Sequence, residues 1–454
     1  MNSKSMINDL TEGPLTKQLL SFIAPFMLSN LMQTLYNMVD MAVVGQFCGS
    51  AGLSAVTIGG HLLDCFTFLC MGLTAASQII IAQHIGSGDR EGVSRAIGTG
   101  FSFVLLFSLF TTVLGLSCSK LFLRWLNTPD VAWEYAMDYC VVCYCGLFFI
   151  YGYNVVSAIL RGMGESKKPF LFICIAACIN TVLDLLFVGV LKMGAFGAAL
   201  ATVIGQGASF IFSLVYLYRR RVSFGFDFKP KSFKIDPRQL KMLLKLGFPL
   251  IVQHLAVNIT IMYVSSFINA YGVAYSAVSG VGFKINRIVN IVTQATSGGG
   301  SSIIGQNFGA GKFSRVKRIV YTELIMCFIF ASILAIIIIT APRFVFGLFT
   351  DDSAVLDLAP MYVPYSVMFF YGASLRSPFM GFINGLGNSR FAMFGGIMDG
   401  VVARLGLALG LGILAGMGIT GFWLGDALAG FTIGIIGAIY FFFSKWQERK
   451  LIIN

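Results

Sequence analysis

The residues of this sequence that could do chemistry are acids inside long apolar stretches. Asp40 and Asp184 each lie within one, and Asn180 precedes Asp184 by four residues, which puts both on one helix face. A charge at bilayer depth costs at least about 2.5 kcal/mol, so each such acid is a functional candidate. Two neighbouring carboxylates in a low dielectric do not both stay ionised. The pair therefore predicts a site for a proton or for an oxygen-liganded cation such as sodium.

Helix rise brings further polar residues to the same level. At about 1.5 Å per residue, Asp40 lies roughly 35 Å and Asp184 roughly 22 Å from the cytoplasmic ends of their helices. Tyr139 and Thr202 each lie about 12 Å from the outer ends of theirs. With Asn180, these side chains are expected in one outer-leaflet pocket that contains no lysine or arginine. The alternative is a hydrogen-bond network that only ties the helices together.

Long apolar segments must position these groups. Of 454 residues, 57% are hydrophobic and 11% charged, against about 25% charged in an ordinary soluble domain. A bilayer core about 30 Å thick needs about 20 mostly apolar residues per helix. Twelve segments meet this requirement: residues 15–44, 51–84, 94–117, 131–160, 169–190, 194–218, 241–268, 273–304, 318–341, 354–383, 391–414 and 418–443. We expect an all-α integral membrane protein with twelve transmembrane helices.

The basic residues set the orientation. With the N-terminus inside, 24 of the 32 lysines and arginines, Lys4 among them, fall at the inner ends of the segments and four at the outer ends. By the positive-inside rule, both termini are cytoplasmic. The net charge of +12 is therefore a topology signal and does not indicate nucleic-acid binding. The polar residues 1–16 lack the apolar core of a secretory signal.

No cofactor is predicted. Cys140, Cys143 and Cys145 share one apolar segment without a histidine cluster, so we expect small buried hydrophobic residues rather than a metal or redox site. The stretch 309–312, GAGK, lacks the first glycine and the Ser or Thr of a phosphate-binding loop. Without an ATP site, the energy source is expected to be a gradient of H+ or Na+.

An internal repeat at an offset of 223 divides the chain. Residues 83–88, QHIGSG, recur at 306–311 as QNFGAG, and residues 162–166, GMGES, recur at 385–389 as GLGNS. Each half contains six segments, an even number, so both halves enter the membrane from the same side. This predicts two six-helix lobes related by a parallel pseudo-twofold repeat, with a substrate between lobes that rock.

The repeat also sets the expected domain boundaries. The N-terminal lobe covers residues 1–218 and carries the cation coupling, a basic cytoplasmic linker covers 219–240, and the C-terminal lobe covers 241–454. Repeated lobes favour a transporter over a receptor or a membrane enzyme.

The second half differs from the first in its acids. Leu407 stands at the repeat position of Asp184, and we expect unpaired acids, and hence ion coupling, in the first half alone. Arg404 and Asp426 reach similar depths from opposite sides, so we expect them to meet. Because an Arg–Asp pair carries its own counter-charge, we interpret it as structural.

A second set of charges is symmetric. His61 and Asp64 occupy the repeat positions of Lys284 and Arg287. Equal depth and opposite sign would permit an Asp64–Arg287 pair that closes one face of the carrier as a gate. The alternative is separate pairing, or water-facing charge, within each half.

Together these features resemble the multidrug and toxic compound extrusion (MATE) family. The resemblance rests on the repeated six-segment unit, the loops at Gln83 and Gln306 and the RGMG turn at 161–164, and it covers essentially the whole chain. Acids at Asp40 and Asp184 resemble the DinF-like branch, which includes MepA-like exporters.

The resemblance implies a cation site, a hinge and a class of substrate. It implies a cation site of Asp40, Asp184, Asn180 and Thr202, with Tyr139 and Asn154 in its network, although Asn154 falls close to the cytoplasmic end of its segment. Pro25 would be the hinge of the first segment; the alternative is a tolerated membrane proline. Substrates would be amphipathic organic compounds, often cationic. Side chains suited to line their cleft are Met32, Gln33, Tyr36, Met262 and Tyr263.

We therefore expect a multidrug efflux transporter and not an enzyme. It would exchange drugs for H+ or Na+ by rocking alternating access, as a monomer in a bacterial inner or plasma membrane. The alternative is a flippase for a lipid-linked saccharide, which would prefer a basic central cavity. An ion channel is disfavoured because no filter-like segment occurs, and an enzyme because His61, His84 and His254 form no catalytic set.

Overall fold

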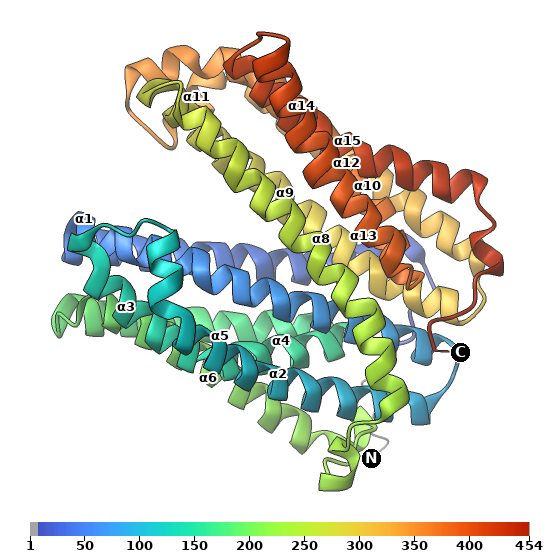
Figure 1. Ribbon diagram of the computed structural model, residues 1–454. Coiled ribbons are helices and arrows are strands. Elements are labelled where there is room, and N and C mark those ends of the chain that lie inside the picture. Colours follow the sequence, from blue (N-terminus) through green and yellow to red (C-terminus); the bar gives the residue numbers. More distant parts are fainter. Residues whose placement is uncertain (1–7, 454) are drawn as a thin grey trace. The chain divides into compact units, whose positions relative to one another are not determined.

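The computed structural model describes residues 8–453, and all regular secondary structure in that range is helical (Figure 1). Lys4, used above for orientation, lies outside the described residues. The helices of the first half are α1 (Leu15–Gly86), α2 (Arg90–Trp125), α3 (Asp130–Cys145), α4 (Leu147–Gly162), α5 (Lys167–Asp184), the π-helix η1 (Leu185–Val190), α6 (Gly194–Arg219) and α7 (Arg221–Phe224).

The second half begins after the short 3-10 helix η2 (Pro230–Phe233). Its helices are α8 (Pro237–Asn269), α9 (Val273–Gly309), α10 (Phe313–Thr340), α11 (Pro342–Gly347), α12 (Ser353–Gly385), α13 (Ser389–Ile397), the π-helix η3 (Met398–Leu405), α14 (Gly406–Leu409), the π-helix η4 (Gly410–Leu414), α15 (Ile419–Phe443) and the 3-10 helix η5 (Trp446–Glu448).

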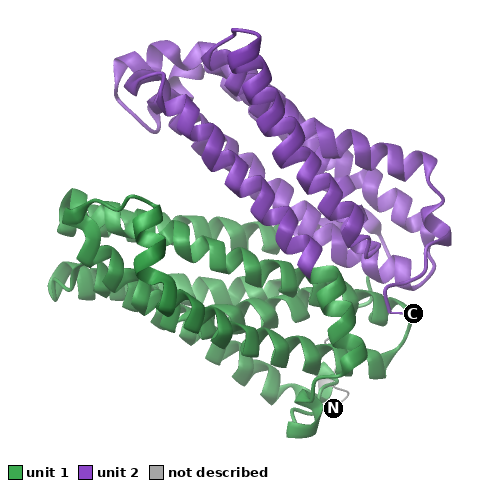
Figure 2. Cartoon of the chain, viewed as in Figure 1, with its two compact units in different colours: residues 1–10, 24–247 green, residues 11–23, 248–454 purple. Residues whose placement is uncertain are grey.

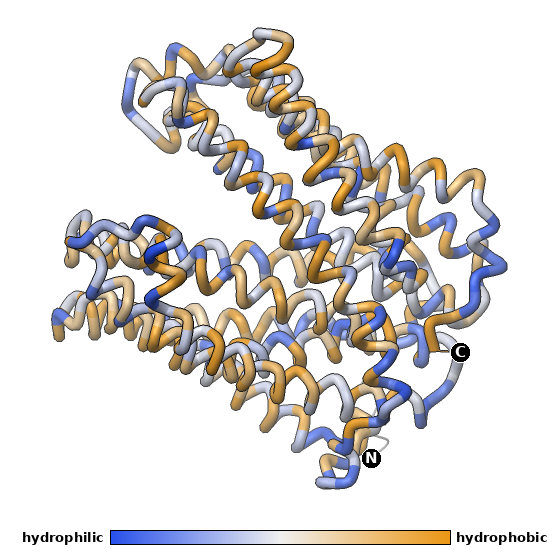
Figure 3. Tube along the Cα trace, viewed as in Figure 1, coloured by the Kyte–Doolittle hydropathy of each residue, from blue (hydrophilic) through white to orange (hydrophobic). Residues whose placement is uncertain are grey.

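The helices account for the twelve expected segments. By length and composition, nine helices of the described chain could cross a membrane, or ten if the pair α3 and α4, bent by 48°, is one span. α1 has 72 residues and holds two expected segments, with a break in helical geometry at Gly49. α9 follows the expected eighth segment but is too polar to be among the ten. The helices are predominantly hydrophobic, and hydrophilic residues occur at several of their ends and in the connections (Figure 3).

The chain forms two compact units, each a bundle of helices (Figure 2). Among the described residues, unit 1 comprises 8–10 and 24–247, and unit 2 comprises 11–23 and 248–453. These boundaries differ from the lobes expected from sequence, because α1 begins in unit 2 and α8 begins in unit 1. In unit 1, α5 packs on α6 and α2 on α4; in unit 2, α12 packs on α9, α10 and α15.

The first turns of α1 are held by unit 2. Lys312 donates to the Thr11 hydroxyl over 2.9 Å, and Arg315 donates to the Gln18 side chain over 2.6 Å. Ile23 lies against Gly299, where a methyl group would come within 3.1 Å of it. α1 and α8 thus each change unit two residues before a proline, Pro25 in α1 and Pro249 in α8.

The turns of the internal repeat match in their hydrogen bonds. The Asp89 amide donates to the His84 carbonyl over 3.0 Å, and the Lys312 amide donates to the Asn307 carbonyl over 2.9 Å. Each of these turns contains a glycine with positive φ, 77° at Gly88 in the first copy and 69° at Gly311 in the second. Since left-handed backbone favours glycine, the repeated sequence and the repeated turn have one cause.

The basic linker folds onto unit 1. The ring of Phe226 is buried, with its centroid 5.2 Å from that of Phe233. The Ser102 hydroxyl donates to the Phe233 carbonyl over 2.7 Å, and the Asp236 amide donates to the Thr99 hydroxyl over 3.0 Å. The linker is therefore a packed part of unit 1, fixed on α2, and not a loose tether.

Candidate cation site and charge clusters

Three helices of unit 1 position the two acids. Asp40 lies in α1, and Asp184 is the last residue of α5, where the helix continues as the π-helix η1. Such π-helical turns often occur at functional sites because they shift side chains out of the regular helix register. Asp184 is 0% exposed and Asp40 6%.

The carboxylates of Asp40 and Asp184 lie within electrostatic range of each other. Both oxygens of Asp184 and Oδ1 of Asp40 have no hydrogen-bond partner. No ion pair among residues 8–453 includes either acid. Two unpaired carboxylates are therefore buried together, an arrangement that binding of a proton or another cation would stabilise.

Amide and hydroxyl groups complete the oxygen donors. Asn180, one turn before Asp184, donates from Nδ2 to the Thr202 hydroxyl of α6 over 3.3 Å, and its Oδ1 is buried without a partner. The structure thus brings Asn180 and Thr202 together, as the sequence predicted. Carboxylate, amide and hydroxyl oxygens are the ligands that hard cations prefer.

Tyr36 and Gln33, which were predicted to line the drug cleft, lie beside this site, and their role in the cleft stays a prediction. Gln206, one turn after Thr202, donates to the Tyr36 hydroxyl over 3.1 Å. Gln33 bonds to the same hydroxyl, and Tyr36 interacts electrostatically with Asp40. Sequence reasoning missed Gln206, although a glutamine four residues from Thr202 in an apolar helix was a signal.

Tyr139 lies against α1. Its ring packs on Gly59, where a methyl group would come within 2.4 Å of a ring carbon, and it interacts electrostatically with Asp40. In unit 2 the repeat partner Tyr362 packs in the same way on Gly282. The ring position is therefore part of the repeated framework.

The structure places the other predicted site residues as follows. Asn154 donates to the carbonyl of Ile150 in its own helix over 2.8 Å. Pro25 lies inside the continuous helix α1. The cleft candidates are Met32, half-buried in unit 1, and Met262 and Tyr263, exposed in unit 2.

The gate candidates are exposed and divided between the units. His61 and Asp64 lie in unit 1, while Lys284 and Arg287 lie in unit 2. The Asp64–Arg287 pair therefore stays a prediction. Within residues 8–453, no group of three His, Cys, Asp or Glu side chains is arranged to hold a metal ion.

Arg404 and Asp426 meet inside unit 2, which confirms that expectation. Arg404 in η3 donates to Asp426 in α15 and also reaches Asp399 over 3.4 Å. Asp399 accepts a further bond from Arg376 in α12 over 3.2 Å. Two arginines and two aspartates thus form a neutral buried network, in which Asp399 and Arg376 were not anticipated.

One expectation about unit 2 is wrong. Unpaired acids were predicted in the first half alone, yet Glu323 in α10 is 0% exposed and neither of its carboxylate oxygens has a partner. A glutamate within an apolar segment was the available signal. The sequence did not show that, among the described residues, no basic side chain forms an ion pair with Glu323.

A family model described as MatE matches residues 25–186 and 249–399. The chain belongs to the MatE family. Each matched segment begins at the proline that follows a change of unit, Pro25 or Pro249. Membership confirms the resemblance to MATE transporters inferred from the repeat and the acids. It identifies a membrane transporter rather than a class of enzyme.

Several multidrug resistance proteins are similar to this MatE family member. It is 28% identical to the probable multidrug resistance protein YpnP of Bacillus subtilis over 98% of each chain. It is 21% identical to the multidrug export protein MepA of Staphylococcus haemolyticus over 86% of each chain.

Solved structures share the fold of this MatE chain. A multidrug resistance MATE family transporter of the MOP superfamily, in an outward-facing conformation, matches 97% of this chain and 98% of its own with a TM-score of 0.90 at 22% identity. A MOP superfamily transporter from Pyrococcus furiosus matches with a TM-score of 0.89. These matches confirm the all-α, twelve-helix, two-lobe architecture.

Proposed function

We propose that this protein exports amphipathic, often cationic, organic compounds in exchange for H+ or Na+ that enter through the site at Asp40 and Asp184. The observation that carries the proposal is the burial of two neighbouring carboxylates whose oxygens lack partners. Membership of a multidrug transporter family supports the class of substrate. The coupling residues are Asp40, Asp184, Asn180 and Thr202, with Gln33, Tyr36 and Gln206 orienting the hydroxyl next to Asp40.

The coupling follows from charge. Without a bound cation, the acids of α1 and α5 repel each other in a medium of low dielectric, which favours an arrangement that admits water. A bound proton or sodium ion removes that repulsion and lets α1 and α5 close on the site. Because α1 begins in unit 2 and continues in unit 1, a change at Asp40 is transmitted along a helix that belongs to both.

The proposal includes the setting of the protein. The chain acts as a monomer in a bacterial cell membrane, with both termini in the cytoplasm, as the basic residues indicate. The only co-reactant is the coupling ion.

Drug flux in vesicles tests this function. Purified protein would be reconstituted, and drug accumulation measured under an imposed proton gradient or an imposed sodium gradient. Asp40→Asn and Asp184→Asn should each lower ion-driven accumulation by at least about tenfold, the effect of about 1.4 kcal/mol. Asp138→Asn, an exposed acid of α3, is the matched control and should transport normally.

Two results decide the outcome. The gradient that drives accumulation identifies the coupling ion. Drug transport that ignores both gradients and both variants would contradict the mechanism. Movement of a lipid-linked saccharide analogue in the same vesicles, without drug transport, would favour the flippase.

A further inference from the structure

Glu323 is a buried acid that the proposed coupling does not use. It lies ten residues into α10, roughly 15 Å from the first residue of that helix. Both of its carboxylate oxygens are buried, and neither has a hydrogen-bond partner. No ion pair in the described part of the chain includes it.

Three helices of unit 2 enclose the carboxyl group. On α9 it fills the space over Gly300, where a methyl group would come within 2.3 Å of Oε1 and 2.8 Å of Oε2. On its own helix the neighbour is the Cys327 thiol, which bonds with the hydroxyls of Thr296 on α9 and Ser377 on α12. That thiol interacts electrostatically with Glu323.

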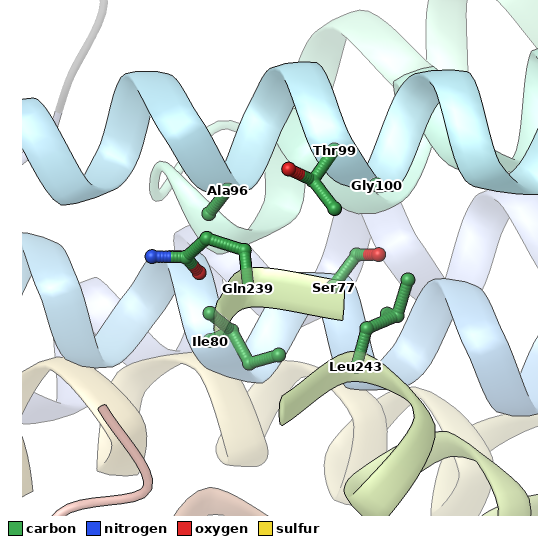
Figure 4. Close-up of a pocket in the computed structure, with 7 residues that line it drawn as sticks. All are labelled: Ser77, Ile80, Ala96, Thr99, Gly100, Gln239 and Leu243. Atoms are coloured by element: carbon green, nitrogen blue, oxygen red, sulfur yellow. The ribbon is translucent and has the colours of Figure 1, made fainter. Parts of the chain in front are cut away.

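Unit 1 provides an internal comparison. The repeat partner of Gly300 is Ser77, and that of Glu323 is Gly100. In unit 2 the glycine is on α9 and the larger side chain on α10, whereas in unit 1 the larger side chain is on α1 and the glycine on α2. A methyl group on Gly100 would come within 2.9 Å of the Ser77 hydroxyl. A small hollow lies there, with Ser77, Thr99 and Gly100 on its wall (Figure 4). The repeated framework is thus built without a carboxyl group in unit 1, and packing alone does not require one in unit 2.

Burial without a counter-charge determines the ionic form. An isolated carboxylate in a medium of low dielectric is strongly disfavoured, and the group takes up a proton instead. A protonated carboxyl group places no charge in the bundle. The nearby thiol and hydroxyls are small polar groups that tolerate a neutral acid but supply no cation.

We propose that Glu323 is a proton-binding site inside unit 2, occupied at neutral pH and separate from the cation site of unit 1. The ligand is a proton, because among the described residues Glu323 belongs to no group of three His, Cys, Asp or Glu side chains that could hold a metal ion. Both units then hold buried acids without an ion-pair partner: Asp40 and Asp184 lie near each other in unit 1, and Glu323 lies in unit 2. This inference stands whether or not Asp40 and Asp184 couple transport.

Infrared spectroscopy of the full-length protein tests the site directly. The measurement uses the Asp40→Asn/Asp184→Asn double variant at pH 7, which removes the two buried, unpaired acids of the candidate cation site in unit 1. We expect a carbonyl stretching band of a protonated carboxylic acid that disappears in Glu323→Gln. Glu323→Asp should shift the band without removing it, and Glu134→Gln, an exposed acid of α3, should leave it unchanged.

A second pair of variants separates the site from general packing. Gly300→Ala forces the carboxyl group away and should shift the same band, whereas Gly100→Ala, at the glycine that faces Ser77 in unit 1, should not. A band that survives Glu323→Gln, or its absence before that substitution, would overturn the proposal. If the double variant does not fold, the same loss and shift are measured against the wild-type spectrum. Failure of drug transport alone has no bearing on this band.

Discussion

Asn180 donates its amide hydrogen to the Thr202 hydroxyl across 3.3 Å, which leaves the amide oxygen unpartnered one turn before Asp184. This bond joins α5 to α6 and fixes which end of the amide is available to a cation. In the second half, Gly425 stands at the repeat position of Thr202 and Leu407 at that of Asp184. The second half therefore has no counterpart of the Thr202 hydroxyl or of the Asp184 carboxylate.

Thr202→Val should weaken the response to the coupling ion. Valine keeps the shape of threonine but cannot accept the bond from Asn180, so the apparent ion affinity should fall about fivefold, or about 1 kcal/mol. Initial transport rates at varied ion concentration give this affinity. Thr322→Val, which removes a hydroxyl bonded only within α10, is the control. Equal ion dependence in both variants would count against the role of Thr202.

Arg404→Leu should destabilise unit 2 strongly. It leaves Asp426 without its arginine and Asp399 with Arg376 alone, and breaking a buried pair from one side costs about 3–5 kcal/mol. Thermal unfolding in detergent measures the change. Arg343→Leu breaks an exposed pair with Asp357 and should cost less than about 1 kcal/mol. Similar losses in the two variants would contradict the structural role of the network.

Asp89→Ala should destabilise the start of α2 in a pH-dependent way. The Asp89 carboxylate accepts a bond from the Gly92 amide over 2.8 Å, and this bond holds the pKa of Asp89 below its ordinary value. Because the folded-state pKa is lowered, the stabilisation is present above the unfolded value, about 3.9, and is lost as pH falls through the folded value. We expect a loss of about 1 kcal/mol at pH 7 that shrinks below pH of about 4.

Unfolding curves at several pH values measure this dependence. Asp89→Asn retains a capping oxygen and should lose only part of the stabilisation, with little change as pH falls. In the second copy, Lys312 precedes α10 and caps nothing with its side chain, so Lys312→Ala should show no such pH profile there. A constant penalty for Asp89→Ala across pH would show that the charge is not involved.

Phe226→Ala should loosen the linker. The ring is 2% exposed and packs edge-on against Phe228 and Phe233, so its removal leaves a cavity that costs about 3 kcal/mol. Trypsin cleavage after Lys231 should become faster, since the segment must leave α2 to be cut. Val222→Ala, 82% exposed in the same region, should be cut at the wild-type rate. Unchanged cleavage of Phe226→Ala would contradict an anchored linker.

The sequence predicted most of the fold because its signals are local or repeated. Apolar length, the bias of basic residues and the copied glycine turns all depend on nearby residues. The contacts of residues 11–23 with unit 2 were not predictable in this way, since Thr11 meets Lys312, 301 residues away. The break between the first two segments was predictable, since the structure leaves helical geometry at Gly49, between residues 15–44 and 51–84.

The site was predictable in its residue types and less so in its neighbours. Asp40 and Asp184 are conspicuous because charge is rare in apolar segments. The contact of Arg404 with Asp426 was predictable because the rise per residue of a helix gives the depth of each side chain in the membrane. Rotation about the helix axis is not fixed in the same way. The sequence therefore did not show that Tyr36 faces Gln206 and the acids, or that Glu323 faces Gly300 rather than a basic residue.

The exchange of helix starts between the units has a consequence for biogenesis. Residues 11–23 leave the ribosome long before their partners Gly299, Lys312 and Arg315 are synthesised. The first turns of α1 therefore lack these partners until seven further segments have been synthesised. A nascent chain that ends at residue 247 lacks these partners, so the start of α1 can take its place only after part of unit 2 has been synthesised.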